Sequence, residues 1–286
     1  MEKNFEKLLE KIGSDFCENI KEKFDFNEIR EIRLLSGKAA KIVTSKGNFS
    51  EGGYITPQKI RDIFASLCDF SVHTYKDDIC RGFITIRGGF RIGICGTAVY
   101  EEGKIINIKD ISALNIRIPH EIKNIAKELL SLNDSGMLII GPPCSGKTTL
   151  LRDFARMKSK NNFVTIVDER TEIAGIYHGE SSFDIGDSTV LNGFLKSDGI
   201  SIAARTMAPE YIICDEFGDE RDVSSSLYAM KSGVKIIASM HALDFEDFLK
   251  KPLSQRIMES GIFGHFIIMN KNCAIEKIIK AGEYQI

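Results

Sequence analysis

The sequence predicts an α/β protein with a smaller α+β domain over residues 1–118 and a larger domain with a mostly parallel sheet over residues 119–286. The length of 286 residues suits two domains of ~100–200 residues each. In the second half, short apolar runs alternate with helix-length segments, a pattern typical of a parallel sheet covered by helices on both faces. The pattern changes near Pro119, because glycine-rich hairpin signals precede it and strand–helix alternation follows it.

Composition excludes several classes of protein. Hydrophobic residues at 43% and charged residues at 27% are near globular averages, which excludes a disordered, collagen-like or coiled-coil chain. The 38 Lys and Arg residues against 40 Asp and Glu leave a net charge of −2, so no overall basic field favours nonspecific nucleic-acid binding. The seven cysteines are an odd number without a C-x-x-C pair, which fits neither a disulfide framework nor a zinc site. The sequence shows neither a signal peptide nor a run of ~18 apolar residues, so we expect a cytoplasmic protein in a reducing compartment.

The first domain is predicted to begin with an amphipathic helix. Residues 2–24 repeat apolar side chains at steps of three and four, and Gly13 is a candidate for a bend. The polar face carries both signs of charge, which favours packing on its own domain over a membrane-surface or partner helix.

Short strands and turns follow in the first domain. We expect strands within residues 29–57 and a helix that begins at Thr56-Pro57. Residues 82–100 contain two strand-like runs around Gly88-Gly89, which predicts a hairpin. The glycines of this hairpin indicate a tight turn. The arginines that alternate along it could instead form a positive surface: Arg81, Arg87 and Arg91.

The second domain is predicted to open with a helix over residues 120–132. Its strand signals are Met137–Ile140, Phe163–Val167, Tyr211–Cys214 and Lys235–Ser239. Residues 264–269 and 273–279 predict an antiparallel hairpin at the edge of the sheet.

Residues 141–148, GPPCSGKT, match the phosphate-loop pattern G-x-x-x-x-G-K-[ST] without a mismatch. The match lies between an apolar run and a predicted helix, as the pattern requires. Its two fixed glycines let the backbone curl so that N–H groups and the helix N-terminus face phosphate oxygens. We expect Lys147 to contact the β- and γ-phosphates of ATP and the Thr148 hydroxyl to bind Mg²⁺. The predicted cofactor-binding residues are Gly141, Pro142, Pro143, Cys144, Ser145, Gly146, Lys147, Thr148 and Thr149.

Two other predicted strands end in acidic residues. Asp215 is predicted to hold Mg²⁺ through water, and the adjacent Glu216 to act as the general base for hydrolysis. Two or three carboxylates of VDERTE could act on the metal or on the attacking water, and Glu169 is the candidate catalytic residue among them. Arg170 could equally neutralise these acids as a surface pair. The run at 163–167 lies between the two motifs, which favours P-loop ATPases with an extra strand between the phosphate-loop strand and the acidic strand.

A histidine lies at a third strand end. We expect His241 to point toward the γ-phosphate and to sense whether that phosphate is present. The other histidines have no partner at ligand spacing and are expected to be structural: His73, His120, His178 and His265.

Four segments taken in order resemble the Walker A, acidic, Walker B and histidine boxes of secretion-type ATPases, whose fold is RecA-like: GPPCSGKTT, VDERTE, IICDEFGDERD and ASMHA. The chain is more similar still to the stage III sporulation protein AA family, over roughly residues 28–270. The segments that carry this resemblance are VDERTEIAG, AARTMAPEYIICDE and RGFITIRGGFRIGICGTAV. The resemblance implies an ATPase of endospore-forming bacteria that acts in the mother cell, at the base of a membrane channel complex leading to the forespore. It also implies a homo-oligomeric ring, a hexamer if secretion ATPases are a guide.

The resemblance further suggests that the first domain closes over nucleotide, its own or a neighbour's, and delivers arginines to it. Four arginines are candidates for stabilising transition-state charge: Arg87, Arg91, Arg117 and Arg205. For each of them, a surface ion pair is the alternative role. Secretion ATPases commonly have Gly before the Walker B Glu, whereas this chain has Asp215, which leaves the role of Glu169 open.

The motifs are compatible with three functions. We expect hydrolysis of MgATP by a ring that works on membrane-embedded sporulation channel proteins. A nucleic-acid motor is one alternative, motivated by the glycines and arginines at 81–93, and a non-hydrolysing nucleotide-gated scaffold is another. A small-molecule phosphotransferase is disfavoured because no arginine-rich lid follows the phosphate loop.

Overall fold

The computed structural model describes residues 2–132 and 135–283. The chain forms two compact units, the first containing residues up to His120 and Gly175–Ser182, the second containing Glu121–Ala174 and the chain from Phe183 onward. Within the first unit, the Tyr75 hydroxyl donates to the Tyr177 hydroxyl at 3.0 Å. The segment Gly175–Ser182 therefore belongs to the first unit although it follows the acidic box in sequence, an arrangement for which the sequence carries no local signal.

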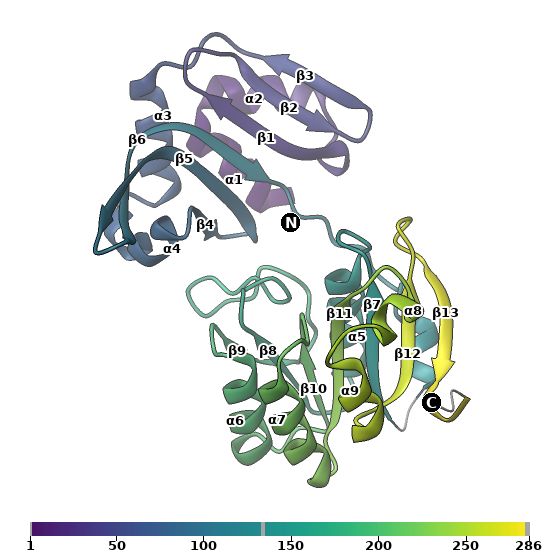
Figure 1. Cartoon of the computed structure of the whole chain (residues 1–286). Coiled ribbons are helices and arrows are strands. Elements are labelled where there is room, and N and C mark those ends of the chain that lie inside the picture. The colour runs from purple at the N-terminus through teal and green to yellow at the C-terminus, as the bar shows by residue number, and fades with distance from the viewer. Residues whose placement is uncertain (1, 133–134, 284–286) are drawn as a thin grey trace. The chain divides into compact units, whose positions relative to one another are not determined.

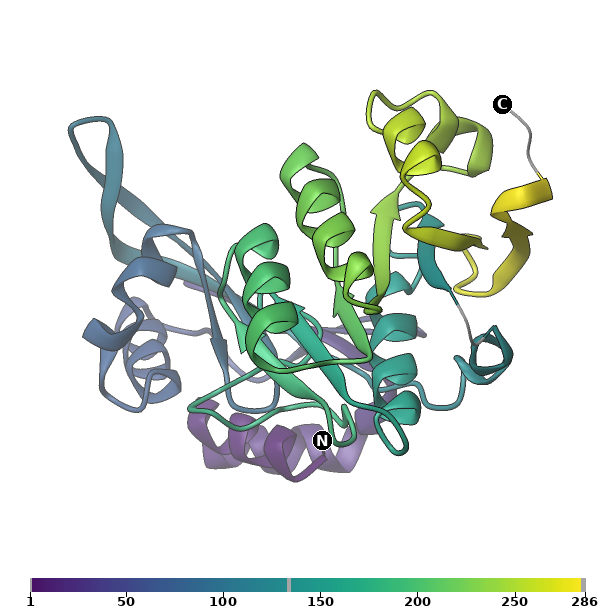
Figure 2. The same cartoon turned by 90° about the horizontal axis from the view of Figure 1, so that it is seen from below.

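The first unit is built on a six-stranded antiparallel sheet in the order β3-β2-β1-β6-β5-β4. Its strands are β1 (Ile29–Leu35), β2 (Ala40–Thr44), β3 (Gly47–Glu51), β4 (Phe83–Ile86), β5 (Phe90–Glu101) and β6 (Lys104–Arg117). Its helices are α1 (Glu2–Ile12), α2 (Ser14–Lys23), α3 (Pro57–Leu67) and α4 (Lys76–Cys80), with 3₁₀ turns η1 (Phe26–Glu28) and η2 (Val72–Tyr75). The predicted hairpin around Gly88-Gly89 is confirmed as β4–β5, and β5 continues into a longer hairpin with β6 that extends out from this unit (Figure 2).

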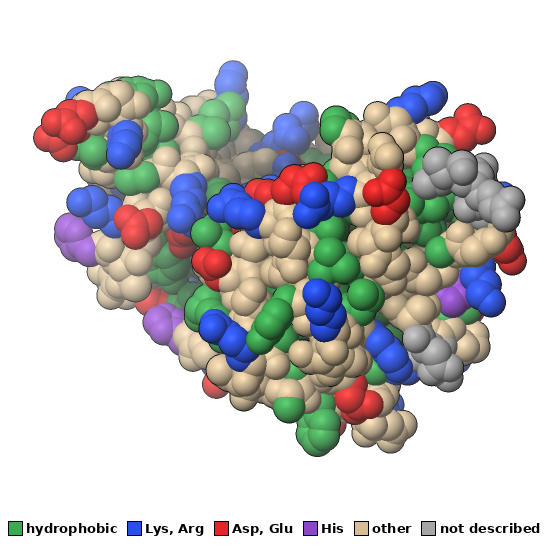
Figure 3. Space-filling model, turned by 60° about the horizontal axis from the view of Figure 1, so that its bottom comes forward, with side chains coloured by type: hydrophobic (Ala, Val, Ile, Leu, Met, Phe, Trp, Pro, Cys, Tyr) green, Lys and Arg blue, Asp and Glu red, His purple; other side chains and the backbone are tan. Residues whose placement is uncertain are grey.

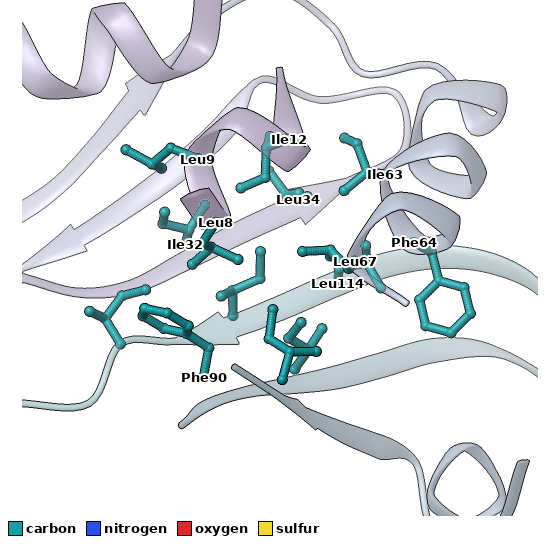
Figure 4. Close-up of a cluster of buried hydrophobic side chains, with 14 of the residues drawn as sticks. Leu8, Leu9, Ile12, Ile32, Leu34, Ile63, Phe64, Leu67, Phe90 and Leu114 are labelled. Atoms are coloured by element: carbon teal, nitrogen blue, oxygen red, sulfur yellow. The ribbon is translucent and has the colours of Figure 1, made fainter. Parts of the chain in front are cut away.

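The N-terminal helices pack on their own unit, as the mixed charge of their polar face predicted. Leu8 and Leu9 of α1 are buried against β1, α3 and β6, and Figure 4 shows these side chains gathered in one core. The helix predicted over residues 2–24 is two helices, because Gly13 between them has a φ of 156°, far from helical values. The helix predicted at Thr56-Pro57 is confirmed, and the Thr56 hydroxyl accepts a hydrogen bond from the Lys59 amide at 3.1 Å.

The second unit contains a seven-stranded sheet in the order β13-β12-β7-β11-β10-β8-β9 (Figure 1). All neighbouring strands are parallel except β12 and β13, which form the predicted antiparallel hairpin. The strands are β7 (Gly136–Gly141), β8 (Val164–Asp168), β9 (Thr189–Asn192), β10 (Tyr211–Cys214), β11 (Lys235–His241), β12 (Phe263–Met269) and β13 (Ile275–Lys280). The helices are α5 (Lys147–Lys158), α6 (Lys196–Thr206), α7 (Glu220–Lys231), α8 (Phe245–Leu249) and α9 (Ser254–Ser260), with 3₁₀ turns η3 (Lys127–Ser131) and η4 (Ala281–Glu283).

Helices cover both faces of this sheet. One set of alternate side chains from β7, β10, β11 and β12 shares a core with α6, α7, α8 and α9. The opposite face packs against α5, where the Phe154 ring lies 6.2 Å from that of Tyr211. This two-sided burial explains why the central strands are continuous apolar runs rather than alternating ones.

Strand order places four strand ends with polar residues side by side. β11 lies between β7 and β10, so one strand separates the phosphate-loop strand from the acidic strand, as expected. The inserted strand is β11, whereas β8 lies on the far side of β10. Because the carboxyl ends of parallel strands share one edge of a sheet, the polar residues that follow β7, β8, β10 and β11 converge there.

The prediction of a helix over residues 120–132 is wrong. Only Lys127–Ser131 is helical, and it is a 3₁₀ helix. Asn124 has a φ of 66°, which interrupts a right-handed helix. The Ala126 amide instead donates to the buried carboxylate of Asp153 at 2.9 Å, so a tertiary contact with α5 determines the path of this segment.

Candidate nucleotide-binding and catalytic site

The phosphate loop connects β7 to α5 at the carboxyl edge of the sheet. A Cβ at Gly141 would meet the Ser145 Oγ at 2.6 Å and the Met269 carbonyl oxygen at 3.0 Å, so only glycine fits there. Gly146, with a φ of 86°, turns the loop directly into the first residue of α5. The first N–H groups of a helix have no partners inside it, so the loop ends at a positively polarised helix N-terminus suited to phosphate.

Two observations fit a bound nucleotide with Mg²⁺. The buried Ser145 Oγ has no hydrogen-bond partner, which suits an incoming phosphate oxygen. The Thr148 hydroxyl donates to Asp215 Oδ2 at 2.7 Å, so the two predicted magnesium ligands are in contact. Mg²⁺ in nucleotide sites takes one or two protein ligands together with phosphate oxygens and water, so this pair suffices. Among residues 2–132 and 135–283, no group of three or more His, Cys, Asp or Glu side chains could hold a metal alone.

Lys147 is buried beneath the phosphate loop. Its Nζ donates to the carbonyl oxygens of Gly141 at 2.9 Å and Pro142 at 2.8 Å, and it lies 3.0 Å from His241 Nδ1. Burial lowers the pKa of Lys147, while the nearby carboxylates of Asp215 and Glu216 act to raise it. The ammonium is therefore poorly solvated, which strengthens its attraction for a phosphate.

His241 connects Lys147 to Glu216. If the Lys147 ammonium donates to Nδ1, that nitrogen is the acceptor and Nε2 carries the ring proton. Nε2 lies 3.1 Å from Glu216 Oε1, within reach of a hydrogen bond. Three predicted catalytic residues, Lys147, His241 and Glu216, thus form one hydrogen-bonded chain.

Glu216 is constrained through both its side chain and its backbone. Arg170 forms an ion pair with Glu216 Oε2, so Arg170 pairs with the predicted base itself. The Glu216 amide donates to Asp215 Oδ1 at 2.9 Å and to the Ser239 Oγ at 3.2 Å. The φ of Glu216 is 49°, in the left-handed region that non-glycine residues rarely adopt. Such strain at a strand end is typical of functional positions.

The acidic box after β8 contains one structural carboxylate and one at the site. Asp168 is buried, and its carboxylate accepts hydrogen bonds from the amides of Glu172, Ile173 and Ala174 at 2.8–3.1 Å. Burial raises the pKa of Asp168, against the lowering effect of these amides. Asp168 therefore anchors the turn after β8. Glu169 is more exposed, and its Oε2 lies 3.8 Å from Lys196 Nζ.

Three of the four candidate arginines belong to the first unit. Arg87 forms an ion pair with Glu180, and the Arg91 guanidinium lies 3.9 Å from the centroid of the Phe83 ring. Arg117 is exposed at the end of β6. The Arg87–Glu180 ion pair corresponds to the alternative that the sequence left open for Arg87, a surface ion pair rather than a contact with nucleotide.

The fourth candidate, Arg205, lies in the last turn of α6. Its Nε donates to the Ser201 carbonyl at 3.2 Å. Lys196, which begins α6, contacts Glu216, and an 11-residue helix is about 16 Å long, so Arg205 lies at the far end of α6 from the site. A role for Arg205 in transition-state stabilisation would therefore require a second copy of the chain.

Two residues that sequence reasoning missed complete the site. The fully buried Ser239 donates its hydroxyl to Asp215 Oδ1. Ser239 lies two residues before His241 on β11, so the period-two alternation of a strand could have indicated it. Lys196 donates to the Glu216 carbonyl oxygen at 2.7 Å, and no motif marks it in the sequence.

Comparison with known proteins shows which family this chain belongs to. The family model described as "Sporulation stage III, protein AA" matches residues 7–284. The chain belongs to this family. This sporulation family includes a curated relative, Stage III sporulation protein AA of Bacillus subtilis (strain 168), which is 35% identical over 256 residues, or 85% of this chain and 83% of the relative. The resemblance stated from the sequence is thereby confirmed.

Solved ATPases share the fold of this sporulation-family protein. The Legionella pneumophila ATPase DotB has a TM-score of 0.57 at 16% identity, covering 89% of this chain and 73% of DotB. The pilus retraction motor PilT, solved with bound ADP, has a TM-score of 0.59 at 19% identity, covering 88% of this chain and 76% of PilT. Across the part of the chain that the structure describes, no helix is both long and apolar enough to cross a membrane.

Proposed function

We propose that this sporulation-family protein hydrolyses MgATP at the carboxyl edge of its parallel sheet. The observation that carries the proposal is the contact chain from Lys147 through His241 to Glu216, beside the Thr148–Asp215 pair. Together these residues provide the parts that phosphoryl transfer needs: a phosphate loop with its lysine, a metal-binding hydroxyl and carboxylate, and a base for water.

Each residue has a distinct role in this reaction. Mg²⁺, when bound, neutralises charge on the phosphate oxygens. The loop amides and the Ser145 hydroxyl bind phosphate oxygens, and the Lys147 ammonium orients toward the β- and γ-phosphates. Thr148 and Asp215 hold the metal. Glu216 orients the attacking water and accepts its proton.

His241 is proposed to report on the γ-phosphate position. It contacts the phosphate-binding ammonium of Lys147 with one ring nitrogen and the Glu216 carboxylate with the other. Movement of Lys147 toward a phosphate would therefore alter the hydrogen bond that holds Glu216. The Arg170–Glu216 ion pair adds a second restraint that must loosen before Glu216 accepts a proton.

We further propose that the active form is a homo-oligomeric ring, a hexamer, that docks on membrane-embedded sporulation channel proteins from the mother-cell cytoplasm. Membership of the sporulation family and the fold shared with the ATPase DotB and the pilus retraction motor PilT support this assignment. A nucleic-acid motor is less well supported, because the face in Figure 3 intersperses acidic with basic side chains and the net charge is −2.

One experiment tests nucleotide turnover and assembly together. We expect the protein to release phosphate from MgATP, and the Glu216→Gln variant to increase in mass to that of a ring when MgATP is added, because bound nucleotide favours the assembled state. The measurements are phosphate release and mass in solution with and without MgATP. Absence of phosphate release from assembled protein would instead support the nucleotide-gated scaffold, and release that requires DNA or RNA would support the nucleic-acid motor.

Replacing Ser239 with Ala should lower kcat about tenfold while leaving ATP affinity within about threefold, because Asp215 and the Glu216 amide each lose one hydrogen bond worth about 1 kcal/mol. Steady-state hydrolysis and equilibrium ATP binding measure the two quantities. Ser226→Ala is the matched control, because Ser226 is equally buried but its hydroxyl has no hydrogen-bond partner. Equal losses in the two variants would contradict a specific role for Ser239.

Alkylation of Cys144 with N-ethylmaleimide should block nucleotide binding, because its exposed thiol lies inside the phosphate loop. MgATP should protect it. Cys214 should not react, since burial raises the pKa of its thiol to about 12.

The control for this labelling is the neighbouring exposed Cys273, whose Sγ lies 3.5 Å from the Cys144 carbonyl oxygen. We expect Cys144→Ser to bind ATP after treatment, and Cys273→Ser to remain sensitive. The reverse pattern would show that Cys273 is the inhibitory site. Mass spectrometry of the labelled peptides and an ATP-binding assay distinguish the outcomes.

A further inference from the structure

Lys196 is a buried cation at the first position of α6, with 9% of its surface exposed. Its Nζ donates to the main-chain carbonyl oxygen of Glu216 at 2.7 Å. Two carboxylates balance its charge, Asp222 at 3.6 Å and Glu169 at 3.8 Å. One ammonium therefore links the end of β8, the end of β10 and the first turn of α7.

The contact with Lys196 completes the restraint of the Glu216 backbone. On its amide side, Glu216 is held by Asp215 Oδ1 and the Ser239 Oγ. On its carbonyl side, it is held by Lys196. A φ of 49° is disfavoured for a glutamate, so contacts on both sides are needed to keep this conformation. The backbone conformation in turn sets the direction in which the Glu216 carboxylate points.

Lys196 also stabilises the segment that follows Glu216. Asp222 Oδ2, the oxygen nearest to Lys196, accepts hydrogen bonds from the amides of Gly218 at 3.3 Å and Asp219 at 3.2 Å. Asp222 is itself buried, so its charge needs a compensating partner. Removing the ammonium would therefore loosen the turn from Glu216 to α7 as well as the Glu216 carbonyl.

We propose that Lys196 is a positioning residue for hydrolysis, which orients the general base Glu216 by holding its carbonyl group and the turn that follows it. The inference rests on the proposed ATPase function, because Lys196 acts on the reaction through Glu216. Nucleotide binding depends on the separate contacts of Lys147 and Thr148 in the phosphate loop. Loss of Lys196 therefore reduces kcat and leaves ATP affinity unchanged.

The test compares Lys196→Met with Lys196→Arg in the full-length, assembled protein. Met keeps most of the side-chain volume but cannot donate a hydrogen bond, and Arg keeps both charge and donors. We expect Lys196→Met to lower kcat about 10- to 100-fold, the effect of a misplaced catalytic group, with ATP affinity changed less than about threefold. Lys196→Arg should recover part of this loss. Lys231→Met, an exposed lysine in the last turn of α7, is the matched control and should behave as wild type.

A double variant distinguishes the loss of Glu216 positioning from the cost of leaving the Asp222 carboxylate buried without a cation. Lys196→Met with Asp222→Asn removes the unbalanced carboxylate while keeping an acceptor for the Gly218 and Asp219 amides. We expect it to restore thermal stability but not kcat. Recovery of wild-type kcat in the double variant would overturn the inference, as would a wild-type kcat in Lys196→Met alone.

Amide hydrogen exchange provides a readout that does not depend on hydrolysis. We expect Lys196→Met to speed exchange in peptides covering residues 216–219 at least tenfold, with no change in peptides covering the phosphate loop. Unchanged exchange at 216–219 would overturn the positioning role. If the wild-type protein releases no phosphate, the proposed function fails, and the exchange result still decides whether Lys196 holds this segment.

Discussion

Replacing Glu216 with Gln should stop ATP turnover while preserving ATP binding. Gln has nearly the same volume and can still accept the hydrogen bond from His241 Nε2, but it cannot take a proton from water. General-base catalysis contributes about 10²- to 10⁴-fold, so we expect kcat to fall by at least about 100-fold. The proposed contacts with the phosphates of ATP are made by the phosphate loop and not by Glu216, so ATP affinity should change less than about threefold.

The loss of the Arg170–Glu216 ion pair in this variant should have little effect on stability. The Arg170 side chain is 60% exposed, and exposed ion pairs contribute only about 0–1 kcal/mol. Glu220→Gln is the matched control, because Glu220 also loses a partly exposed ion pair, with Arg256, outside the site. Single-turnover hydrolysis and fluorescent-nucleotide binding measure the two effects. Full turnover by Glu216→Gln would contradict the assignment of the base and direct attention to Glu169.

Replacing Lys147 with Ala should weaken ATP binding by about 30-fold or more and reduce hydrolysis with it. The Lys147 ammonium is 5% exposed and poorly solvated, so its interaction with phosphate is strong. Truncating one partner of a buried, hydrogen-bonded charge pair costs about 2–5 kcal/mol, which corresponds to about a 30-fold or greater loss of ATP affinity. Equilibrium binding and phosphate release are the measurements.

The Lys147→Ala protein should remain folded. Burial lowers the pKa of Lys147 in the folded state, so the charged side chain is itself a cost to folding that Ala removes. Circular dichroism and thermal unfolding check this point. Lys160→Ala, an exposed lysine just after α5, is the control and should bind ATP normally. A Lys147→Ala protein that kept full ATPase activity would rule out the proposed mechanism.

Much of the fold of the second unit could be predicted from local patterns. The four apolar runs became central strands because burial on both faces selects continuous apolar residues, and this signal lies within each strand. The segment at 120–132 could not be predicted in the same way. Its path depends on the Ala126–Asp153 contact, which joins residues 27 positions apart.

The site divides in the same way between local and distant contacts. The phosphate loop could be predicted because its glycines, lysine and threonine act within eight consecutive residues. The pairing of Arg170 with Glu216 could not, because it requires β8 and β10 to be neighbours in the sheet. Lys196 lies in an ordinary helix start, and only the packing of α6 against the sheet brings it to Glu216.

The sequence by itself therefore determined the α/β class, the phosphate loop and the strand ends that carry Asp215, Glu216 and His241. Each of these rests on residues close together in the chain, where periodicity, glycine placement and residue chemistry act locally. Only the tertiary structure decided which side chains hold Glu216 and that Gly175–Ser182 packs with the first unit. Apart from the adjacent Asp215, those contacts join segments 20 to 108 residues apart, and their free energy exists only once the sheets are assembled.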